Sequence, residues 1–401
     1  MVNRYNIVYR CSACGNVESD PLPRFPKKII YLDQCAISSI VKAKDAFWTD
    51  LHKKLKNLIG LQLIACPYSR FHHEESMLSE QWRDDLQTLY KELAGEDRLR
   101  CPDDIEFTQL RRELRAYLGQ PESSDDGDFW KEFCEEDPHR FTGDMVVYCH
   151  FDPHPQIVLN VQQRKDRTHK GMEEVAEYWR QNPQKFKQAV AVEAEAYGRS
   201  LIEAYRELVD GAKHIENMLP GELLSAYRSI VRPGEFNVST PPGNAPGVRL
   251  VHFLMCDVLK QRPNEHNPFS VVEEFFRSDQ MKKVPFLDIS SRLRATIAQQ
   301  TQSDKKPRKP KPSDNYDVKA VSTYAPYCDA MFLDNEFRNL SEQRNIDVPG
   351  RYDVKLFSAN NRDAFAGYLQ DILVTGMSSE HHERLALVYP EWAPALRQQR
   401  E

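Results

Sequence analysis

The sequence predicts an α/β fold with a parallel sheet, interrupted by a large and mainly helical insertion. Two observations predict this class. At both ends of the chain, short apolar runs alternate with segments of helical periodicity, which is the order of β-α-β units. Between these portions lie more than 200 residues whose apolar positions recur at helical spacing instead.

The N-terminal portion contains one β-α-β unit. The run Ile29–Leu32 lies between Pro26 and Asp33 and does not alternate, which is typical of a strand covered on both faces. Leu61–Cys66 predicts a second such strand. Residues 46–59 predict a helix between them, because apolar side chains recur at helical spacing and lysines lie on the other side.

The C-terminal portion repeats this order. It predicts strands at Ala330–Leu333 and Val354–Phe357, with a helix around 336–343 between them. In the insertion we expect long helices within Glu173–Leu219 and a hairpin of strands 145–150 and 157–161.

We divide the chain into five segments. They are an N-terminal segment with a Cys-x-x-Cys knuckle (1–26), the first part of the α/β domain (27–95), the helical insertion with its hairpin (96–302), a basic proline-rich strap (303–313), and the second part of the domain with C-terminal helices (314–401). Prolines and lysines cannot pack a core, so we expect the strap to be extended and mobile.

Composition limits the function classes. The chain has 401 residues, 40% of them hydrophobic, which excludes wholesale disorder. Its 54 basic and 60 acidic residues give a net charge of −6, so any contact with nucleic acid must be local. Nine irregularly spaced cysteines suit a reducing compartment. With no membrane-spanning stretch and no secretory signal, we expect a soluble cytoplasmic protein without membrane contact.

Acidic residues follow two of the predicted strands. Asp33 ends the first strand, and Asp334 ends the strand at Ala330–Leu333. Ligands of open α/β sheets bind outside the carboxyl ends of the strands. We therefore expect both carboxylates to face one crevice.

Two further acids lie on predicted helices. Glu75 interrupts an apolar stripe that we expect on a single helix, which Ser69 caps; its members are Phe71, Leu78, Trp82, Leu86, Leu89 and Leu93. Glu74 points about 100° away and is expected in solvent. Asp317 opens a later helix, and Asp314 is either its cap or another ligand.

Carboxylates that lie close together in a folded protein require a compensating positive charge or bound protons. Two unit charges about 4 Å apart repel by about 4 kcal/mol at an effective dielectric constant near 20. A cation must neutralise them or some must hold protons. Oxygen ligands suit Mg²⁺ or Mn²⁺ rather than Zn²⁺. The alternative is that each acid is a helix cap or a surface charge.

These motifs resemble those of PIN-like nucleases. The resemblance is carried by Ile-Ile-Tyr-Leu-Asp33, by Pro67-Tyr-Ser-Arg-Phe-His-His-Glu-Glu75, by Asp314-Asn-Tyr-Asp317 and by Tyr327-Cys-Asp-Ala-Met-Phe-Leu-Asp334. The Pro-Tyr-Ser-x-x-His-x-x-acid form is similar to one subgroup of the family. The similarity covers about 130 residues, and the insertion is larger than family members usually carry.

The resemblance implies a three-layer PIN-like domain and a metal-dependent endonuclease. It makes Asp33, Glu75, Asp317 and Asp334 catalytic, metal-binding carboxylates, with Asp314 and Asp329 as further metal-site acids. PIN-like proteins are most often endoribonucleases, some of them toxins or defence effectors. RNA is therefore the expected partner. Two alternatives stay open: a DNA nuclease with the same site, and an inactive scaffold that binds a protein partner through its insertion.

Several side chains are candidates for substrate binding. The strap cations Lys305, Lys306, Arg308 and Lys309 precede Asp314 and are expected to hold phosphates, as is Arg338. The alternative for the strap is a solvated linker. Ser69 and His72 are expected to line the site, although His72 is equally explained as a buried structural histidine.

Cys11 and Cys14 resemble half of a zinc knuckle. The sequence contains no second Cys-x-x-Cys pair. Zn²⁺ at these two cysteines is therefore the less favoured interpretation.

Overall fold

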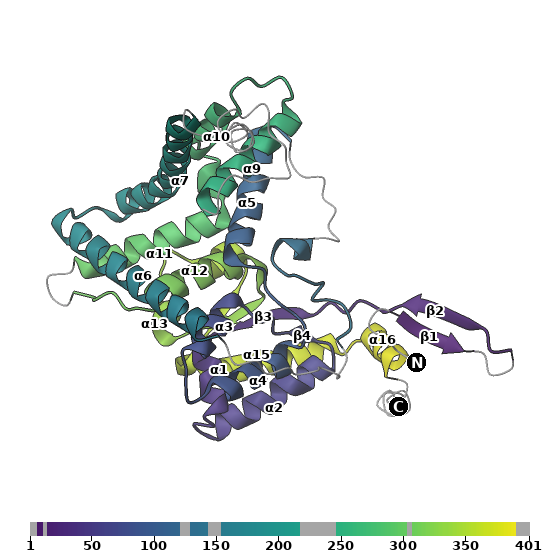
Figure 1. The fold of residues 1–401 in the computed structure, drawn as a ribbon. Coiled ribbons are helices and arrows are strands. Elements are labelled where there is room, and N and C mark those ends of the chain that lie inside the picture. Colours follow the sequence, from purple (N-terminus) through teal and green to yellow (C-terminus); the bar gives the residue numbers. More distant parts are fainter. Residues whose placement is uncertain are drawn as a thin grey trace. The chain divides into compact units, whose positions relative to one another are not determined.

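The computed structural model describes residues 6–10, 14–120, 129–142, 154–216, 246–302 and 307–389. The chain divides into two compact units, which Figure 1 traces by colour along the sequence. The α/β unit comprises residues 1–100, 127–165 and 324–401, and the helical unit comprises residues 101–126 and 166–323.

A four-stranded parallel sheet forms the centre of the α/β unit, which confirms the predicted class. The strand order is β4-β3-β5-β6. Ile30, Tyr31 and Leu32 pair with Ala330, Met331 and Phe332, so two segments 300 residues apart in sequence are neighbours in the sheet. The strands are β3 (Lys28–Leu32), β4 (Ile64–Ala65), β5 (Ala330–Phe332) and β6 (Lys355–Phe357).

The connections leave the two central strands in opposite directions. After β3 the chain runs through α1 (Gln34–Val41) and α2 (Ala46–Gly60) to β4. After β5 it runs through α13 (Asn335–Ser341) and α14 (Val348–Tyr352) to β6, on the other side. The boundary between β3 and β5 is therefore the topological switch point of the sheet, where ligands of open α/β sheets bind.

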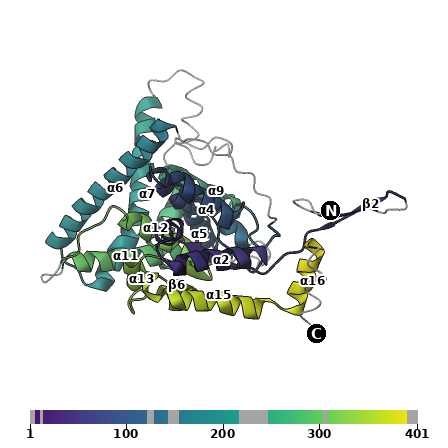
Figure 2. The ribbon, with the colours of Figure 1, turned by 90° about the horizontal axis from the view of Figure 1, so that it is seen from below.

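The side chains of successive strand residues point to opposite faces of the sheet. Ile30, Leu32 and Phe332 pack with α1, α2, α4 (Arg83–Ala94) and α15 (Arg362–Gly376) in one buried core. Helices α2 and α15 lie side by side in it (Figures 1 and 2). Tyr31 points to the other face, as expected for a strand buried on both sides.

The single helix expected from Phe71 to Leu93 is wrong, because the structure contains two. Helix α3 (Arg70–Met77) ends at Leu78, and α4 begins after Trp82. The N–H groups of Leu78 and Ser79 bond to carbonyls only three residues back, which closes the helix with tight turns. Apolar residues continue to recur at spacings of three and four across this break, so their periodicity alone could not locate it.

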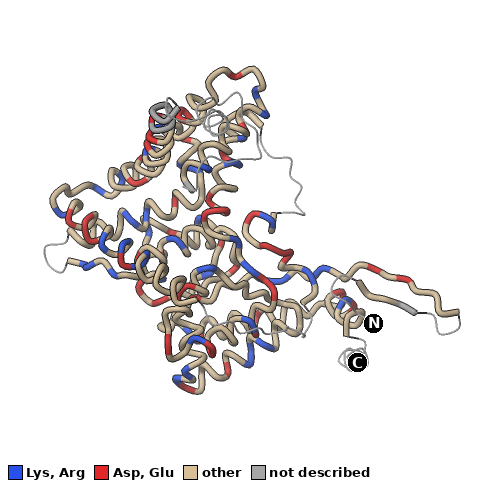
Figure 3. Tube along the Cα trace, viewed as in Figure 1, with Lys and Arg blue, Asp and Glu red and all other residues tan. Residues whose placement is uncertain are grey.

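The helical unit has its own core. It contains α5 (Pro102–Tyr117), α9 (Pro246–Gln261), α10 (Pro268–Arg277) and α11 (Pro285–Thr301), with most of α7 (Phe186–Glu216) packed against them. The long helices expected within Glu173–Leu219 correspond to the end of α6 (Pro155–Gln181), which begins earlier than expected, and to α7. Basic and acidic residues are interspersed along the described chain (Figure 3).

The strand expected at 157–161 is wrong, because these residues lie in α6. Pro155 is the first helical residue, a position that proline favours. His154 caps the helix, since its ring Nδ1 accepts from the N–H of Gln156 at 3.2 Å. The hairpin's other expected strand, 145–150, lies outside the described residues.

An antiparallel hairpin precedes the sheet in the chain. Its strands are β1 (Asn6–Arg10) and β2 (Val17–Pro21), and Asn6 pairs with Pro21. Among the described helices of the whole chain, none combines the length and apolar character needed to cross a bilayer.

Candidate functional site

Asp33 and Asp334 occupy equivalent places on the two central strands. Each follows its strand and is the N-cap of the next helix, with φ and ψ of −63° and 160° for Asp33 and −64° and 161° for Asp334. The Asp33 N–H donates to the carbonyl of Phe332 at 2.9 Å, so the ladder continues to the end of β3. The Asp334 carboxylate accepts from the N–H of Phe337 at 2.7 Å. Both acids thus lie at the switch point.

Glu75 adds a third carboxyl group to this edge. It lies in α3, which begins after β4 with Ser69 as its N-cap, and its side chain is half-buried. The charge of Asp33 acts on Glu75, and the charges of both acids act on the buried Tyr31. Asp334 in turn acts on Asp33. The structure therefore brings together three of the predicted carboxylates.

Burial and the charge of a neighbouring acid disfavour the charged forms of Asp33 and Glu75. The pKa of Asp33 rises to about 6, chiefly through burial, although the Cys35 thiol lowers it; Asp334 raises it further. The pKa of Glu75 rises to about 8 through burial and the charge of Asp33, with Lys165 acting in the opposite direction. A cation placed among these carboxylates would relieve both costs.

Glu74 corrects the expectation that it lies in solvent. It is 5% exposed, and its carboxylate pairs with Arg70 at 2.6 Å and with Arg164 at 2.5 Å. Arg164 belongs to α6, so its position next to α3 could not be read from local spacing. Neighbouring glutamates thus differ: one is held between two arginines, and the other, Glu75, faces Asp33.

Behind the carboxylates, His72 lies in a column of aromatic rings. It stacks on Tyr31 at 5.0 Å and on Tyr90 at 4.5 Å between ring centroids. Its Nδ1 accepts from the N–H of Ser69, and the Ser69 hydroxyl accepts from the N–H of His72, which forms a capping box. Burial lowers the pKa of His72 to about 3. This geometry favours the structural interpretation for both Ser69 and His72.

The carboxylates suit a metal that needs few protein ligands. Among the residues that the structure describes, no group of three or more His, Cys, Asp or Glu side chains is arranged to hold a metal ion. Mg²⁺ is usually held by only one or two carboxylates, with water and substrate phosphate as the other ligands. The paired Asp33 and Asp334, with Glu75 nearby, fit this pattern of oxygen donors.

Asp317 and Asp314 lie in α12 (Asp314–Tyr324), whose first ten residues belong to the helical unit. Asp314 is fully buried and binds the Arg308 guanidinium through two bonds of 2.6 Å. Its carboxylate also accepts from the N–H of Lys311 at 2.8 Å. Arg308 therefore anchors the strap to α12. Asp317 is half-buried, and its role as a fourth metal ligand stays a prediction.

The other predicted side chains have partners or lie at the surface. Asp329 precedes β5, where it pairs with Lys28 at 2.7 Å and accepts from the N–H of Ile29 at 2.8 Å. Arg338 pairs with Glu342 at 2.8 Å, and Lys309 is exposed. Lys305 and Lys306 lie outside the described residues.

For the zinc hypothesis, the structure describes only one of the two cysteines. Cys14 is exposed in the turn before β2, with a free thiol. Cys11 lies outside the described residues, so zinc binding there stays a prediction.

Sequence reasoning missed three residues at this edge: Gln34, Tyr90 and Lys165. The Tyr90 hydroxyl donates to the side-chain oxygen of Gln34, and Lys165 acts electrostatically on Glu75. Only Gln34 had a usable signal, because it directly follows Asp33. Comparison with protein-family models, with curated proteins and with solved structures finds no significant match.

Proposed function

We propose that this chain is a divalent-metal-dependent nuclease of the PIN-like type that acts on RNA in preference to DNA. The observation that carries the proposal is the position of Asp33 and Asp334 on adjacent parallel strands at the switch point. The order of the acidic motifs supports the PIN-like assignment, and the raised pKa values of Asp33 and Glu75 support a site that receives a cation.

The surroundings of each residue determine the role that we assign to it. Asp33 and Asp334 would hold Mg²⁺ or Mn²⁺, since both are fixed as helix N-caps at the ends of strands. The bound ion would polarise the phosphodiester and lower the pKa of an attacking water. Glu75 lies beside Asp33, where its carboxylate can orient that water and accept its proton. The buried aromatic rings behind the acids exclude bulk solvent from one side.

The direct test is cleavage by the purified full chain. Labelled single-stranded RNA, single-stranded DNA and duplexes are incubated with the protein in Mn²⁺, and in EDTA as a blank. The proposal predicts that single-stranded RNA is cut fastest and that EDTA stops the reaction. Faster cutting of DNA would favour the DNA-nuclease alternative.

A matched pair of variants separates the enzyme from an inactive scaffold. Asp33→Asn should abolish cleavage, whereas Asp45→Asn should retain it. Asp45 is likewise an N-cap, of α2, and lies away from the switch point, where its carboxylate accepts from the N–H of Phe47 at 3.0 Å and pairs with Arg362 at 2.6 Å. Asparagine caps helices as well as aspartate does, so both variants should fold. A scaffold would keep its biological effect in Asp33→Asn.

A further inference from the structure

Tyr90 is held rigidly next to the carboxylate edge. It lies in α4, is 3% exposed, and stacks on His72 with an interplanar angle of 21°. The edge of its ring also contacts Tyr68, with centroids 5.2 Å apart. These contacts fix the direction in which its hydroxyl group points.

That hydroxyl group determines the orientation of Gln34. Burial, together with the charges of Glu75 and Asp33, raises the pKa of Tyr90 well above its ordinary value, so the phenol keeps its proton. It donates to Oε1 of Gln34. An amide nitrogen cannot accept such a bond, so Oε1 must face the tyrosine and Nε2 must point away from it.

The Nε2 group of Gln34 is available to a ligand. Among the described residues it has no protein acceptor, and it is not one of the polar atoms buried without a partner, so it is open to solvent. Gln34 is the first residue of α1 and directly follows Asp33. Its side chain bonds to the Tyr90 hydroxyl, on which the charges of Glu75 and Asp33 act, so the amide lies in the neighbourhood of these two carboxylates.

The Gln34 amide adds a neutral side-chain donor directly next to Asp33. Ionised carboxylates only accept hydrogen bonds, whereas a phosphodiester presents only acceptor oxygens to a protein. A neutral amide can bind a phosphate oxygen without forming an ion pair with Asp33 or Glu75. Gln34 would thus complement the metal, which binds the carboxylates.

We propose that Gln34 binds the substrate by donating from Nε2 to a non-bridging oxygen of the phosphodiester, and that Tyr90 positions this amide. The inference rests on the proposed nuclease function and adds its substrate-binding residue. Tyr90 is a positioning residue, since it acts only through Gln34.

The test compares kcat and KM for single-stranded RNA in Mn²⁺ among wild type, Gln34→Ala, Gln34→Glu and Tyr90→Phe. A hydrogen bond to a charged group is worth a factor of about 10 to 100, so Gln34→Ala should lower kcat/KM by that factor. Gln34→Glu keeps the shape but repels phosphate, so it should lower kcat/KM further. Because it is isosteric, it carries the test if Gln34→Ala does not fold.

Tyr90→Phe tests positioning apart from packing, because it keeps the stacked ring. It should lower kcat/KM less than Gln34→Ala, and the double variant should be no worse than Gln34→Ala alone. Tyr68→Phe is the matched control, since the Tyr68 hydroxyl contacts His73 at 3.1 Å instead of Gln34. It should behave like wild type.

Two failures are distinguishable. If the wild type cuts none of the nucleic acids, the nuclease function and this inference both fall. If the wild type cuts RNA but folded Gln34→Ala and Gln34→Glu match its kcat/KM, the inference alone is overturned. Additive effects of Tyr90→Phe and Gln34→Ala would overturn the positioning role of Tyr90.

Discussion

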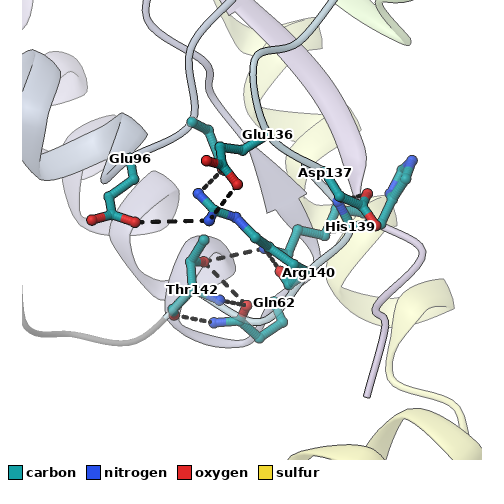
Figure 4. Close-up of polar contacts among 9 residues, drawn as sticks. Gln62, Glu96, Glu136, Asp137, His139, Arg140 and Thr142 are labelled. Atoms are coloured by element: carbon teal, nitrogen blue, oxygen red, sulfur yellow. Dashed lines mark hydrogen bonds and ion pairs between the residues drawn. The ribbon is translucent and has the colours of Figure 1, made fainter. Parts of the chain in front are cut away.

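Two regions of the α/β unit differ in the partners of their acidic side chains. At the carboxylate edge, Asp33, Glu75 and Asp334 face one another. In the second region, which we call the Arg140 network, the carboxylates of Glu96, Asp97 and Glu136 each pair with Arg140, and Figure 4 shows the contacts of Glu96 and Glu136. Arg140 pairs with Asp97 at 3.3 Å, Glu136 at 3.4 Å and Glu96 at 3.7 Å.

The Arg140 network joins segments that are distant in sequence. The buried Lys27 ammonium donates to the Arg140 carbonyl at 2.7 Å and to the Thr142 hydroxyl at 3.1 Å. Gln62 donates to the Thr142 carbonyl at 2.9 Å and accepts from its N–H at 3.0 Å, as Figure 4 shows. The network therefore fixes residues 137–142 to the start of β3 and to the turn before β4.

The two regions differ in whether an acidic side chain has a basic partner. We use this difference to separate acids that anchor the fold from acids that bind a ligand. Asp97 has basic partners within the chain, Lys27 and Arg140, which lower its pKa against the larger effect of burial. Acids that gather without such partners cost stability, and an ion or substrate can compensate that cost. On this argument the carboxylate edge is a binding site, whereas the Arg140 network is an anchor. The following variants test this contrast, starting with the largest effect.

Arg140→Met should destabilise the protein most. It leaves the carboxylate of Asp97, which is 4% exposed, without its arginine, and breaking such a buried pair costs about 3–5 kcal/mol. Urea unfolding followed by circular dichroism measures this change. The control is Arg384→Met, which breaks an exposed pair with Glu380 and should cost less than about 1 kcal/mol. Equal effects would contradict the role of the Arg140 network.

Asp33→Asn and Asp334→Asn should each lower the cleavage rate by at least about 100-fold, because loss of a metal ligand costs more than loss of its supporting partner. Their circular dichroism spectra should match that of the wild type. Asp317→Asn, assayed in the same way, tests the predicted fourth ligand. Retained cleavage in folded Asp33→Asn would contradict the assignment.

The neighbouring glutamates should have opposite effects on stability in EDTA. Glu75→Gln removes a carboxyl group that must take up a proton on folding, because its pKa rises to about 8, and should raise the free energy of unfolding by about 2 kcal/mol at pH 7.5. Glu74→Gln should lower it by about 1–2 kcal/mol, since it removes the shared partner of Arg70 and Arg164. Thermal and urea unfolding measure both. Loss of stability in both variants would contradict the proposed difference between Glu74 and Glu75.

Stability in EDTA should also depend on pH. The pKa values of Asp33 and Glu75 are raised to about 6 and about 8, so the folded chain binds more protons than the unfolded chain. The contribution of these groups is therefore complete below about pH 4 and is lost as pH rises through 6 and 8. The advantage of Glu75→Gln over wild type should grow from pH 5 to pH 8. A difference in unfolding free energy between the two proteins that stays constant over this pH range would contradict the raised pKa of Glu75.

Lys27 should act in the opposite direction at higher pH. Burial lowers its pKa from 10.5 to about 8, so between these values the unfolded chain binds more protons. Its contribution is complete above pH 10.5 and is lost as pH falls through 8. Lys27→Met should therefore flatten the rise of the unfolding free energy between pH 8 and 10, measured in urea. An unchanged slope of the unfolding free energy against pH in Lys27→Met would contradict the lowered pKa of Lys27.

The sequence predicted the parts of the site that depend on local signals. Unalternating apolar runs located the strands, and Asp33 and Asp334 follow directly from where they end. The order of the strands depends on pairing across 300 residues, which periodicity does not contain. For the same reason, the arginine partner of Glu74 on α6 was missed.

Local ambiguity explains the other errors. Ile157 and Leu159 alternate as in a strand, but the N-cap at His154 and Pro155 at the first helical position make this segment helical. The tyrosine that orients Gln34 lies 56 residues further along the chain, so only the folded structure relates them.

A crystal soaked in Mn²⁺ tests the central claim most directly, read by anomalous scattering. We predict a peak at the carboxyl ends of β3 and β5, about 2.0–2.3 Å from oxygens of Asp33 and Asp334, with water completing the coordination. The peak should be absent from the Asp33→Asn crystal. An ordered crystal at saturating Mn²⁺ with no peak at this edge would contradict the account.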